Sequence, residues 1–419
     1  MSPADGSARA IEALEVHKGD HPVGELRRIP SGARFAYSPA YAALGDSPGR
    51  RIALRMPVRA EPYEVRGVNL HPYFAGLLPE GLRLTALVRR AKTSPDDLFT
   101  LLVACGGDAI GDVWVTPLAD EPAPPELEPA PPFDPRDLSR TTFADLLADH
   151  LRRGEPVAVP GAMPKLSAAR ITLPLRTPVG ARQYLLKLAP PDHPRLVENE
   201  AFFMALARSV GIETARVRVV HDVAAESGLL VERFDRRPRA QAPAGAPVPT
   251  PFERLHVEDM VQLLDRYPAD KYRLPMREVM EALDHTSAPL PERLRLLERL
   301  AFAYLIADGD LHGKNIALLT RDSLTRLSPA YDILSTLPYG DNHQALRIEG
   351  RDQDLRRSHF LALGLRHGLR APAIERVLNR LTARLAPHLA RLPEIGLPPR
   401  ETRHLERTLT ERLSHLAAS

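Results

Sequence analysis

The sequence lacks long apolar runs and any cysteine besides Cys105, and its first residues lead us to expect no N-terminal signal peptide. A single cysteine excludes an intramolecular disulfide and favours a reducing compartment, so we expect a cytoplasmic protein. We interpret Cys105 as a buried or half-buried thiol without a catalytic role. No apolar segment reaches the roughly 18–20 residues of a membrane-spanning helix, and we expect no membrane partner.

A strong charge of one sign is also missing. The chain has 56 Lys and Arg against 53 Asp and Glu, a net charge of +3. This balance does not predict direct binding to nucleic acid. The composition, at 44% hydrophobic, is that of a globular protein, and 419 residues predict two or three domains.

Prolines are abundant, and the 42 of them cluster in two segments. We interpret 121–138 as a Pro-rich linker and 236–251 as a Pro/Ala-rich insertion, because neither has a hydrophobic period. These segments leave an N-terminal α+β subdomain over 1–120, a mixed unit over 139–235 and a helical unit over 252–419.

The N-terminal subdomain is predicted to hold short strands at 23–26, 34–37 and 113–115. Ser94 and Pro95 predict the N-cap and first position of a helix, which Gly106 and Gly107 would stop. We expect no titratable cluster belonging to this subdomain.

In the unit over 139–235, strands and a helix are predicted to alternate, and the unit over 252–419 is predicted to be helical. Strands are predicted at 183–188 and 229–234, with a helix at 198–209 between them. Later, a helix opens at Pro291 with an apolar stripe, and a similar stripe begins at Ile374. A mixed small lobe followed by a helical large lobe predicts an α+β fold of the two-lobed protein-kinase type.

The spacing of three polar residues is the main functional signal. Asp310 stands five residues before Asn315, and Asp332 follows after a short apolar strand. Protein kinases use this spacing for a catalytic Asp and two magnesium ligands. We therefore predict that Asp310 takes the proton of the acceptor hydroxyl and that Asn315 and Asp332 bind Mg²⁺. Taken singly, the three could be a helix-ending surface Asp, a turn residue and a helix N-cap.

Two further residues are candidates for the same site. Lys187 lies between Leu186 and Leu188 on a predicted strand, where a buried ammonium needs a partner. ATP phosphates and Glu200, or else Glu198, would supply that partner. His312 lies between the predicted base and metal ligand, and it either contacts the transferred phosphate or is a structural histidine.

The nucleotide-binding loop and hinge are weaker predictions. A phosphate-covering loop would include Val159, Gly161, Ala162 and Lys165, although one glycine among prolines is equally typical of a turn. A hinge for adenine would run through Glu232 and Phe234, which otherwise read as an ordinary strand end.

Several ordered motifs together resemble the HipA family of bacterial toxin kinases, over nearly the whole chain. The motifs are Leu77-Leu78-Pro79-Glu80-Gly81, Gly107-Asp108-Ala109-Ile110-Gly111, Gly161-Ala162-Met163-Pro164-Lys165-Leu166-Ser167, Leu186-Lys187-Leu188, Glu198-Asn199-Glu200, Val231-Glu232-Arg233-Phe234-Asp235, Glu258-Asp259-Met260-Val261-Gln262, Asp310-x-His312-x-Lys314-Asn315 and Pro329-x-Tyr331-Asp332. The resemblance implies a Ser/Thr protein kinase that uses ATP and Mg²⁺. It also implies that Gln262 and His312 line the nucleotide site.

The resemblance carries an expected biology. Such proteins are toxins of toxin–antitoxin systems that arrest growth by phosphorylating a translation component, commonly an aminoacyl-tRNA synthetase. Their partner is a HipB-like helix-turn-helix antitoxin on operator DNA. This chain has no recognition-helix signature, so we expect DNA contact only through the antitoxin.

Two departures from the family pattern leave alternatives open. Ala158 replaces the phosphate-loop serine whose autophosphorylation switches family members off, and Asp308 stands where the catalytic loop usually begins with Asn. One alternative is a catalytically weak, kinase-like binding module that acts as a co-repressor with the antitoxin. Another is a kinase for a lipid or small molecule.

Overall fold

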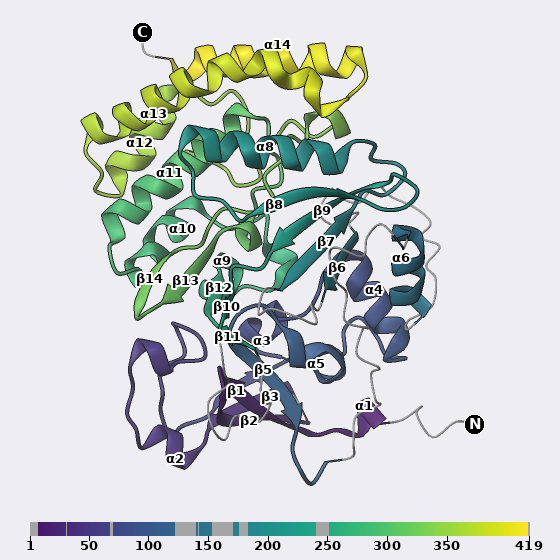
Figure 1. The fold of residues 1–419 in the computed structure, drawn as a ribbon. Helices are drawn as coiled ribbons and strands as arrows, with labels where there is room; N and C mark the ends of the chain where they lie inside the picture. Colours follow the sequence, from purple (N-terminus) through teal and green to yellow (C-terminus); the bar gives the residue numbers. More distant parts are fainter. Residues whose placement is uncertain are drawn as a thin grey trace.

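The computed structural model describes residues 7–30, 32–67, 70–121, 140, 142–152, 171–175, 183–239 and 251–417. It has the predicted α+β architecture, in which antiparallel sheets are combined with a large helical region. In Figure 1 the N-terminal sheet lies at the bottom, a second sheet in the middle and the C-terminal helices at the top. No helix within these ranges is long and apolar enough to cross a membrane.

The N-terminal unit is a five-stranded antiparallel sheet in the order β4-β3-β2-β1-β5. Alternate residues of its strands, such as Ala33, Phe35 and Tyr37, face a core that also takes in Phe74 and Phe99 from the helices. The strands and main helices are β1 (Ala13–Lys18), β2 (His21–Ile29), β3 (Gly32–Tyr37), β4 (Tyr63–Arg66), β5 (Val113–Pro117), α3 (Pro72–Gly76), α4 (Gly81–Arg90) and α5 (Leu98–Cys105). The three predicted strands are confirmed.

The predicted start of α5 is wrong, although its end is confirmed. The helix begins at Leu98, and its N-cap is Asp97, whose carboxylate accepts the N–H of Thr100 at 3.2 Å. Ser94 instead accepts the N–H of Asp96 in a turn before the helix. A carboxylate competes well for the N-cap position, so the Ser–Pro pair did not decide the boundary.

The second sheet has four antiparallel strands in the order β6-β7-β9-β8, and α8 packs against it (Figure 1). These elements are β6 (Ile171–Leu175), β7 (Tyr184–Leu188), β8 (Val217–His221), β9 (Ser227–Glu232), α8 (Leu196–Val210) and the flanking α6 (Phe143–Arg152). The predicted strands around Lys187 and Leu230 and the helix around Glu200 are confirmed. Strand β7 is internal to the sheet, between β6 and β9.

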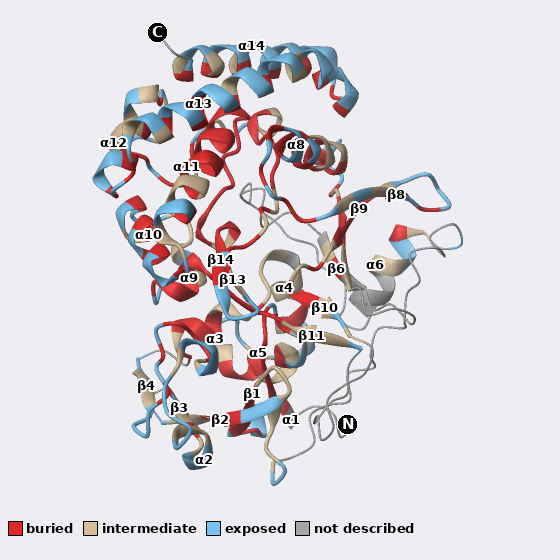
Figure 2. Cartoon of the chain, turned by 60° about the vertical axis from the view of Figure 1, so that its left-hand side comes forward, coloured by how far each residue is buried: buried red, intermediate tan, exposed pale blue. Residues whose placement is uncertain are grey.

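The C-terminal region is mainly helical, as predicted. Figure 2 shows buried residues concentrated along α11, and Leu297, Ala301 and Leu305 of its apolar stripe are fully buried. The stripe that begins at Ile374 is also buried. The elements are α9 (Met260–Leu263), α10 (Met276–Ala282), α11 (Pro289–Leu305), α12 (Arg357–Arg366), α13 (Ala371–Leu385), α14 (Pro399–Leu416) and the sheet β12 (His256–Asp259), β13 (Ala317–Arg321) and β14 (Leu324–Leu327).

The segment 236–251, interpreted from the sequence as a Pro/Ala-rich insertion, begins with a short strand. Its first residues form β10 (Arg236–Pro238), which pairs with β11 (Phe252–Arg254). Arg236 is buried and donates to the carbonyls of Ala109 and Gly111. Residues 240–250 lie outside the described ranges, as does the predicted linker beyond Glu121. Strands β11 and β12 were missed because they are short and carry charged side chains, even where those side chains are buried.

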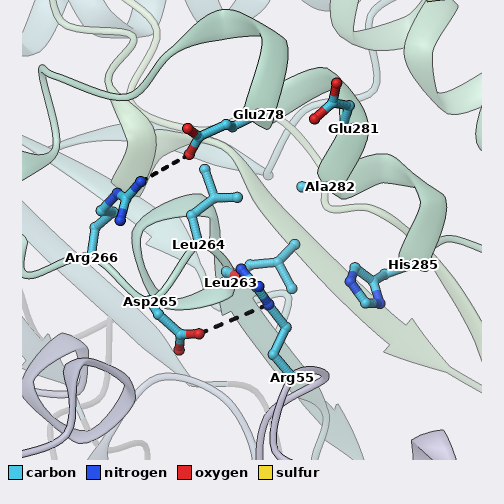
Figure 3. A pocket seen from close by; sticks show the side chains of 9 residues that line it. All are labelled: Arg55, Leu263, Leu264, Asp265, Arg266, Glu278, Glu281, Ala282 and His285. Atoms are coloured by element: carbon cyan, nitrogen blue, oxygen red, sulfur yellow. Dashed lines mark hydrogen bonds and ion pairs between the residues drawn. The ribbon is translucent and has the colours of Figure 1, made fainter.

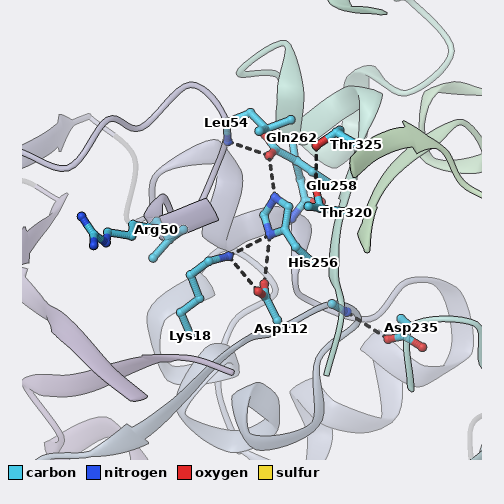
Figure 4. Close-up of polar contacts among 12 residues, drawn as sticks. Lys18, Arg50, Leu54, Asp112, Asp235, His256, Glu258, Gln262, Thr320 and Thr325 are labelled. Atoms are coloured by element: carbon cyan, nitrogen blue, oxygen red, sulfur yellow. Dashed lines mark hydrogen bonds and ion pairs between the residues drawn. The ribbon is translucent and has the colours of Figure 1, made fainter. Parts of the chain in front are cut away.

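A charged cluster joins the N-terminal unit to the C-terminal region (Figure 4). Lys18 donates to Asp112 at 2.7 Å, and a ring nitrogen of His256 lies 2.9 Å from the same carboxylate. Glu258 lies beside His256 at 3.4 Å and accepts the N–H of Leu54 at 2.8 Å. Burial opposes ionisation of Asp112, but Lys18 and His256 outweigh it and hold the pKa of this carboxyl well below its usual range. The expectation that the N-terminal subdomain lacks a titratable cluster is therefore wrong, because half of this one comes from Lys18 of β1 and from Asp112, directly before β5.

Candidate active site

Lys187 lies at the centre of a buried ion-pair arrangement. Its ammonium donates to Glu200 of α8 at 2.6 Å and also contacts Asp332. The Lys187 side chain is 8% exposed and that of Glu200 is 3% exposed. Glu198 points elsewhere and faces Arg195 at 3.4 Å. The preferred pairing of Lys187 with Glu200 is confirmed, and Asp332 joins them from the segment after β14, 132 residues after Glu200 in the sequence.

The backbone before Asp332 is fixed by the loop that follows α8. The N–H of Ala330 donates to Glu213 at 2.8 Å, and the N–H of Ala215 donates back to Ala330 at 2.8 Å. Asp332 has a φ of +57°, a left-handed conformation that Asp tolerates better than most residues. No helix begins at this position, so the alternative reading of Asp332 as a helix N-cap is wrong.

Asp310 lies in a tightly braced loop after α11, and it is 3% exposed. Its N–H donates to the Asp308 carboxylate at 2.8 Å, and its carbonyl accepts the Asn315 side-chain amide at 2.8 Å. The hydroxyl of Tyr272 donates to Asp310 Oδ1 at 2.5 Å. Asp310 is therefore not a surface residue that ends a helix, and Asn315 closes the loop around it.

His312 is buried beside this carboxylate. Its Nε2 lies 3.9 Å from Asp310 Oδ1, and its ring packs edge-to-face on Tyr272 with centroids 4.9 Å apart. Burial and the nearby Lys271 lower the pKa of His312 well below its usual value, so the imidazole is neutral at pH 7. Neither ring nitrogen has a hydrogen-bond partner among the described residues.

A cleft of about 260 Å³ brings five of the predicted site residues together. It opens between the N-terminal unit, through Gly76 and Glu80, and the two lobes that carry Lys187 and the 310–315 loop. The predicted residues that line it are Lys187, Gln262, His312, Asn315 and Asp332. The amide of Gln262 also donates to the carbonyl of Tyr73 at 3.0 Å, so this side chain ties the cleft to α3.

The hinge residues do not line this cleft. The N–H groups of Glu232 and Arg233 donate to the carbonyls of Arg216 and Gln183 at 2.9 Å, so the protein itself occupies these two donors. The ring of Phe234 packs against Tyr331 with centroids 5.6 Å apart. This local pairing favours the reading of Glu232 as an ordinary strand end.

The predicted phosphate-covering loop lies outside the described residues. This applies to Val159, Gly161, Ala162 and Lys165, and also to Ala158.

Three residues of the site were missed or given no role. Tyr272 contacts Asp310 from 38 positions earlier, and no spacing rule connects the two. Lys314 lies inside the 310–315 motif, and its ammonium donates to the carbonyl of Gly76 at 3.1 Å and lies 3.8 Å from Asp259. Burial raises the pKa of the Asp259 carboxyl to about 6, against the opposing effect of Lys314.

A different cavity, of about 540 Å³, lies between Arg55 of the N-terminal unit and α10 (Figure 3). Arg55 faces Asp265 at 3.8 Å and Arg266 faces Glu278 at 3.1 Å across this cavity. It contains none of the predicted site residues. Within the part of the chain that the structure describes, no three His, Cys, Asp or Glu side chains are grouped as a metal site.

A sheet with an internal lysine paired to a helix carboxylate, facing an Asp–Asn loop on a helical lobe, defines a two-lobed, protein-kinase-like fold. Family models agree and extend this: the HipA N-terminal domain matches residues 14–116 and the HipA-like C-terminal domain matches 157–389. The chain belongs to the HipA family.

Individual relatives cover most of the chain. "Putative kinase Y4mE" of Sinorhizobium fredii is 30% identical over 92% of both chains. "Serine/threonine-protein kinase toxin HipA" of Shewanella oneidensis is 24% identical over 91% of this chain and 90% of its own. The solved complex of Shewanella oneidensis HipA, HipB and operator DNA contains a chain with the same fold, with a TM-score of 0.75, 21% identity and 96% coverage of both chains.

Proposed function

We propose that this chain is an ATP- and Mg²⁺-dependent serine/threonine protein kinase that acts in the cytoplasm as the toxin of a toxin–antitoxin system. The observation that carries the proposal is the contact of Lys187 with both Glu200 and Asp332, because it joins the small lobe to the large lobe at one point. Phosphoryl transfer depends mainly on such positioning and on charge neutralisation.

The residues at and beside the cleft have the following roles in this proposal. Lys187 would hold the α- and β-phosphates of ATP, with Glu200 fixing its direction. Asp310 would orient the acceptor hydroxyl and take its proton, a contribution typically worth ~10²–10⁴ in rate. Tyr272 and Asp308 hold Asp310 in place from two sides.

The chemistry of the donors fits magnesium. Asn315 directs its Nδ2 to the carbonyl of Asp310, which leaves the amide oxygen on its other branch, and Asp332 supplies a carboxylate. Both residues line the same cleft. Hard oxygen donors of this kind, few in number and completed by phosphate oxygens, are typical of Mg²⁺ in kinases. When bound, the ion would neutralise charge on the phosphates.

The proposed partners follow from family membership. The solved HipA relative is bound to HipB and operator DNA, which supports a HipB-like helix-turn-helix antitoxin as the partner of this chain. Contact with operator DNA would then pass through the antitoxin. The proposed substrate is a translation component, with an aminoacyl-tRNA synthetase as the first candidate.

Replacing Asp310 with Asn tests the proposal. The full chain should arrest bacterial growth when expressed and should transfer labelled phosphate from ATP to host proteins. Asp310→Asn should abolish both effects and keep the thermal stabilisation by Mg²⁺ and ATP. Asp192→Asn, at a side chain 70% exposed, is the matched control and should behave as wild type. Growth arrest or phosphate transfer that survives Asp310→Asn would show the kinase proposal to be wrong.

A further inference from the structure

A groove of about 850 Å³ lies next to the catalytic loop, on the C-terminal region. One wall is the segment 272–276, and the other is the segment 341–347. Gly309, which directly precedes Asp310, also lines the groove. The groove is larger than the cleft at Lys187 and Asp332, whose volume is about 260 Å³. The walls of the groove contain only described residues.

Tyr272 connects this groove to the catalytic carboxylate. The residue lines the groove, and its hydroxyl donates to Asp310 Oδ1 at 2.5 Å. Gly309 is held close to the opposite wall, since a Cβ at this position would meet the carbonyl of His343 at 2.8 Å. A molecule lying in the groove would therefore contact the two residues that flank Asp310 in space and in sequence.

Gln344 is the unusual residue of the groove wall. Residues 344, 346 and 348 are buried at alternate positions, and the other two are Leu346 and Ile348. Gln344 is 4% exposed, yet neither its Nε2 nor its Oε1 has a hydrogen-bond partner among the described residues. Burying an amide without partners is costly, and such a group in a native structure calls for an explanation. A leucine at this position would continue the apolar pattern without that cost.

The backbone around Gln344 holds it in place. Its N–H donates to the carbonyl of Asp352 at 2.7 Å, and Ile348 and Arg351 exchange two hydrogen bonds at 2.8 and 3.0 Å. These contacts make 344–352 a closed hairpin-like loop. The backbone of Gln344 is fixed, whereas its side-chain amide can still rotate, because the terminal torsion angle of glutamine has a broad distribution.

The other polar side chains of the groove do not favour a ligand of one charge. The guanidinium groups of Arg273 and Arg347 are 80% and 73% exposed, and the carboxylates of Asp341 and Asp352 lie in the same groove. An amide offers one donor group and one acceptor, which match the C=O and N–H of a peptide backbone. The combination favours a polypeptide segment over a phosphate or a nucleic acid.

We propose that this groove binds an extended segment of the protein substrate, and that Gln344 forms hydrogen bonds to its backbone while the acceptor Ser or Thr reaches Asp310 past Tyr272. The proposal rests on the proposed kinase function and adds the place where the acceptor polypeptide lies. Recognition through the backbone predicts tolerance of many side chains next to the acceptor residue.

The test uses the full chain with Mg²⁺ and ATP, and a peptide library with a fixed central Ser or Thr as the probe. Gln344→Met keeps the size of the side chain and removes the amide. We expect it to raise the KM for the peptide pool about tenfold, the effect of one lost hydrogen bond, with the KM for ATP unchanged. Gln353→Met is the matched control, a glutamine of the same region that contacts His343 at 3.0 Å and does not line the groove.

A second measurement, retention of library peptides on the immobilised chain, separates this proposal from the kinase proposal. We expect Gln344→Met to retain fewer peptides than wild type and to unfold at the same or a higher temperature. Equal peptide KM and equal retention for wild type and Gln344→Met would overturn the groove proposal and leave the kinase standing. If wild type neither binds ATP nor transfers phosphate, the kinase proposal fails, and retention alone decides on the groove.

Discussion

Asn199 and Ser335 exchange two hydrogen bonds at 3.0 Å, one from the side-chain Nδ2 to the carbonyl of Ser335 and one from the N–H of Ser335 to Oδ1. The neighbour of Asn199 in α8 is Glu200, which pairs with Lys187, and Ser335 follows Asp332 by three residues. One turn of α8 therefore positions the lysine and the segment that carries Asp332.

Asn199→Ala should loosen this connection. Asn199 and Ser335 are both fully buried, so the change leaves a backbone N–H and C=O without partners. We expect a loss of about 1–3 kcal/mol in the free energy of unfolding, measured by urea denaturation, and a raised KM for ATP. Glu198→Ala, which removes a partly exposed pair with Arg195, should cost less than about 1 kcal/mol. Equal effects of the two changes would contradict a special role for Asn199.

Asp308 gives a second prediction, because the family resemblance implies Asn at this position. Its carboxylate accepts the N–H of Asp310 at 2.8 Å, and an Asn side chain has an oxygen that can do the same. Asp308→Asn should keep phosphate transfer within about threefold of wild type, whereas Asp308→Ala should lower kcat roughly 10- to 100-fold by freeing the catalytic loop. Steady-state kinetics of the purified variants would check this. A kcat for Asp308→Ala near that of wild type would show that the brace is dispensable.

The sequence predicted the residues whose roles depend on local spacing. Asp310 and Asn315 lie in one short loop, and Lys187 and Glu200 lie on a strand and the helix that follows it. Both arrangements are local enough for spacing and periodicity to place them. Tyr272 could not be found in this way, because its contact with Asp310 depends on how two distant segments pack. Gln344 was missed for a different reason: an alternating pattern shows which positions are buried and does not show whether a buried amide has a partner.

The charged cluster between the units predicts a strong dependence of stability on Asp112 (Figure 4). Asp112 is 7% exposed and faces both Lys18 and His256. Asp112→Asn leaves the Lys18 ammonium buried without a counter-charge, so we expect a loss of about 3–5 kcal/mol in thermal or denaturant unfolding. Asp120→Asn, at an exposed position after β5, is the control and should have little effect. A small loss for Asp112→Asn would mean that water reaches Lys18.

Asp259 predicts how stability changes with pH. Burial raises the pKa of its carboxyl to about 6 from the ordinary 3.8, so the folded protein holds this proton more tightly than the unfolded chain. Because the folded state binds more protons between these two values, the contribution of Asp259 to stability falls as pH rises from about 4 to about 6 and stays low above that.

An amide cannot ionise, and an Asn side chain at position 259 can still cap α9, where Asp259 accepts the N–H of Gln262 at 2.9 Å. The difference in free energy of unfolding between Asp259→Asn and wild type should therefore grow with pH, in favour of the variant, by on the order of 2–3 kcal/mol across this window. Urea denaturation at several pH values would measure it, with Asp284→Asn, at a side chain 63% exposed, as the control. A difference that stays constant with pH would mean that Asp259 has no raised pKa in the folded protein.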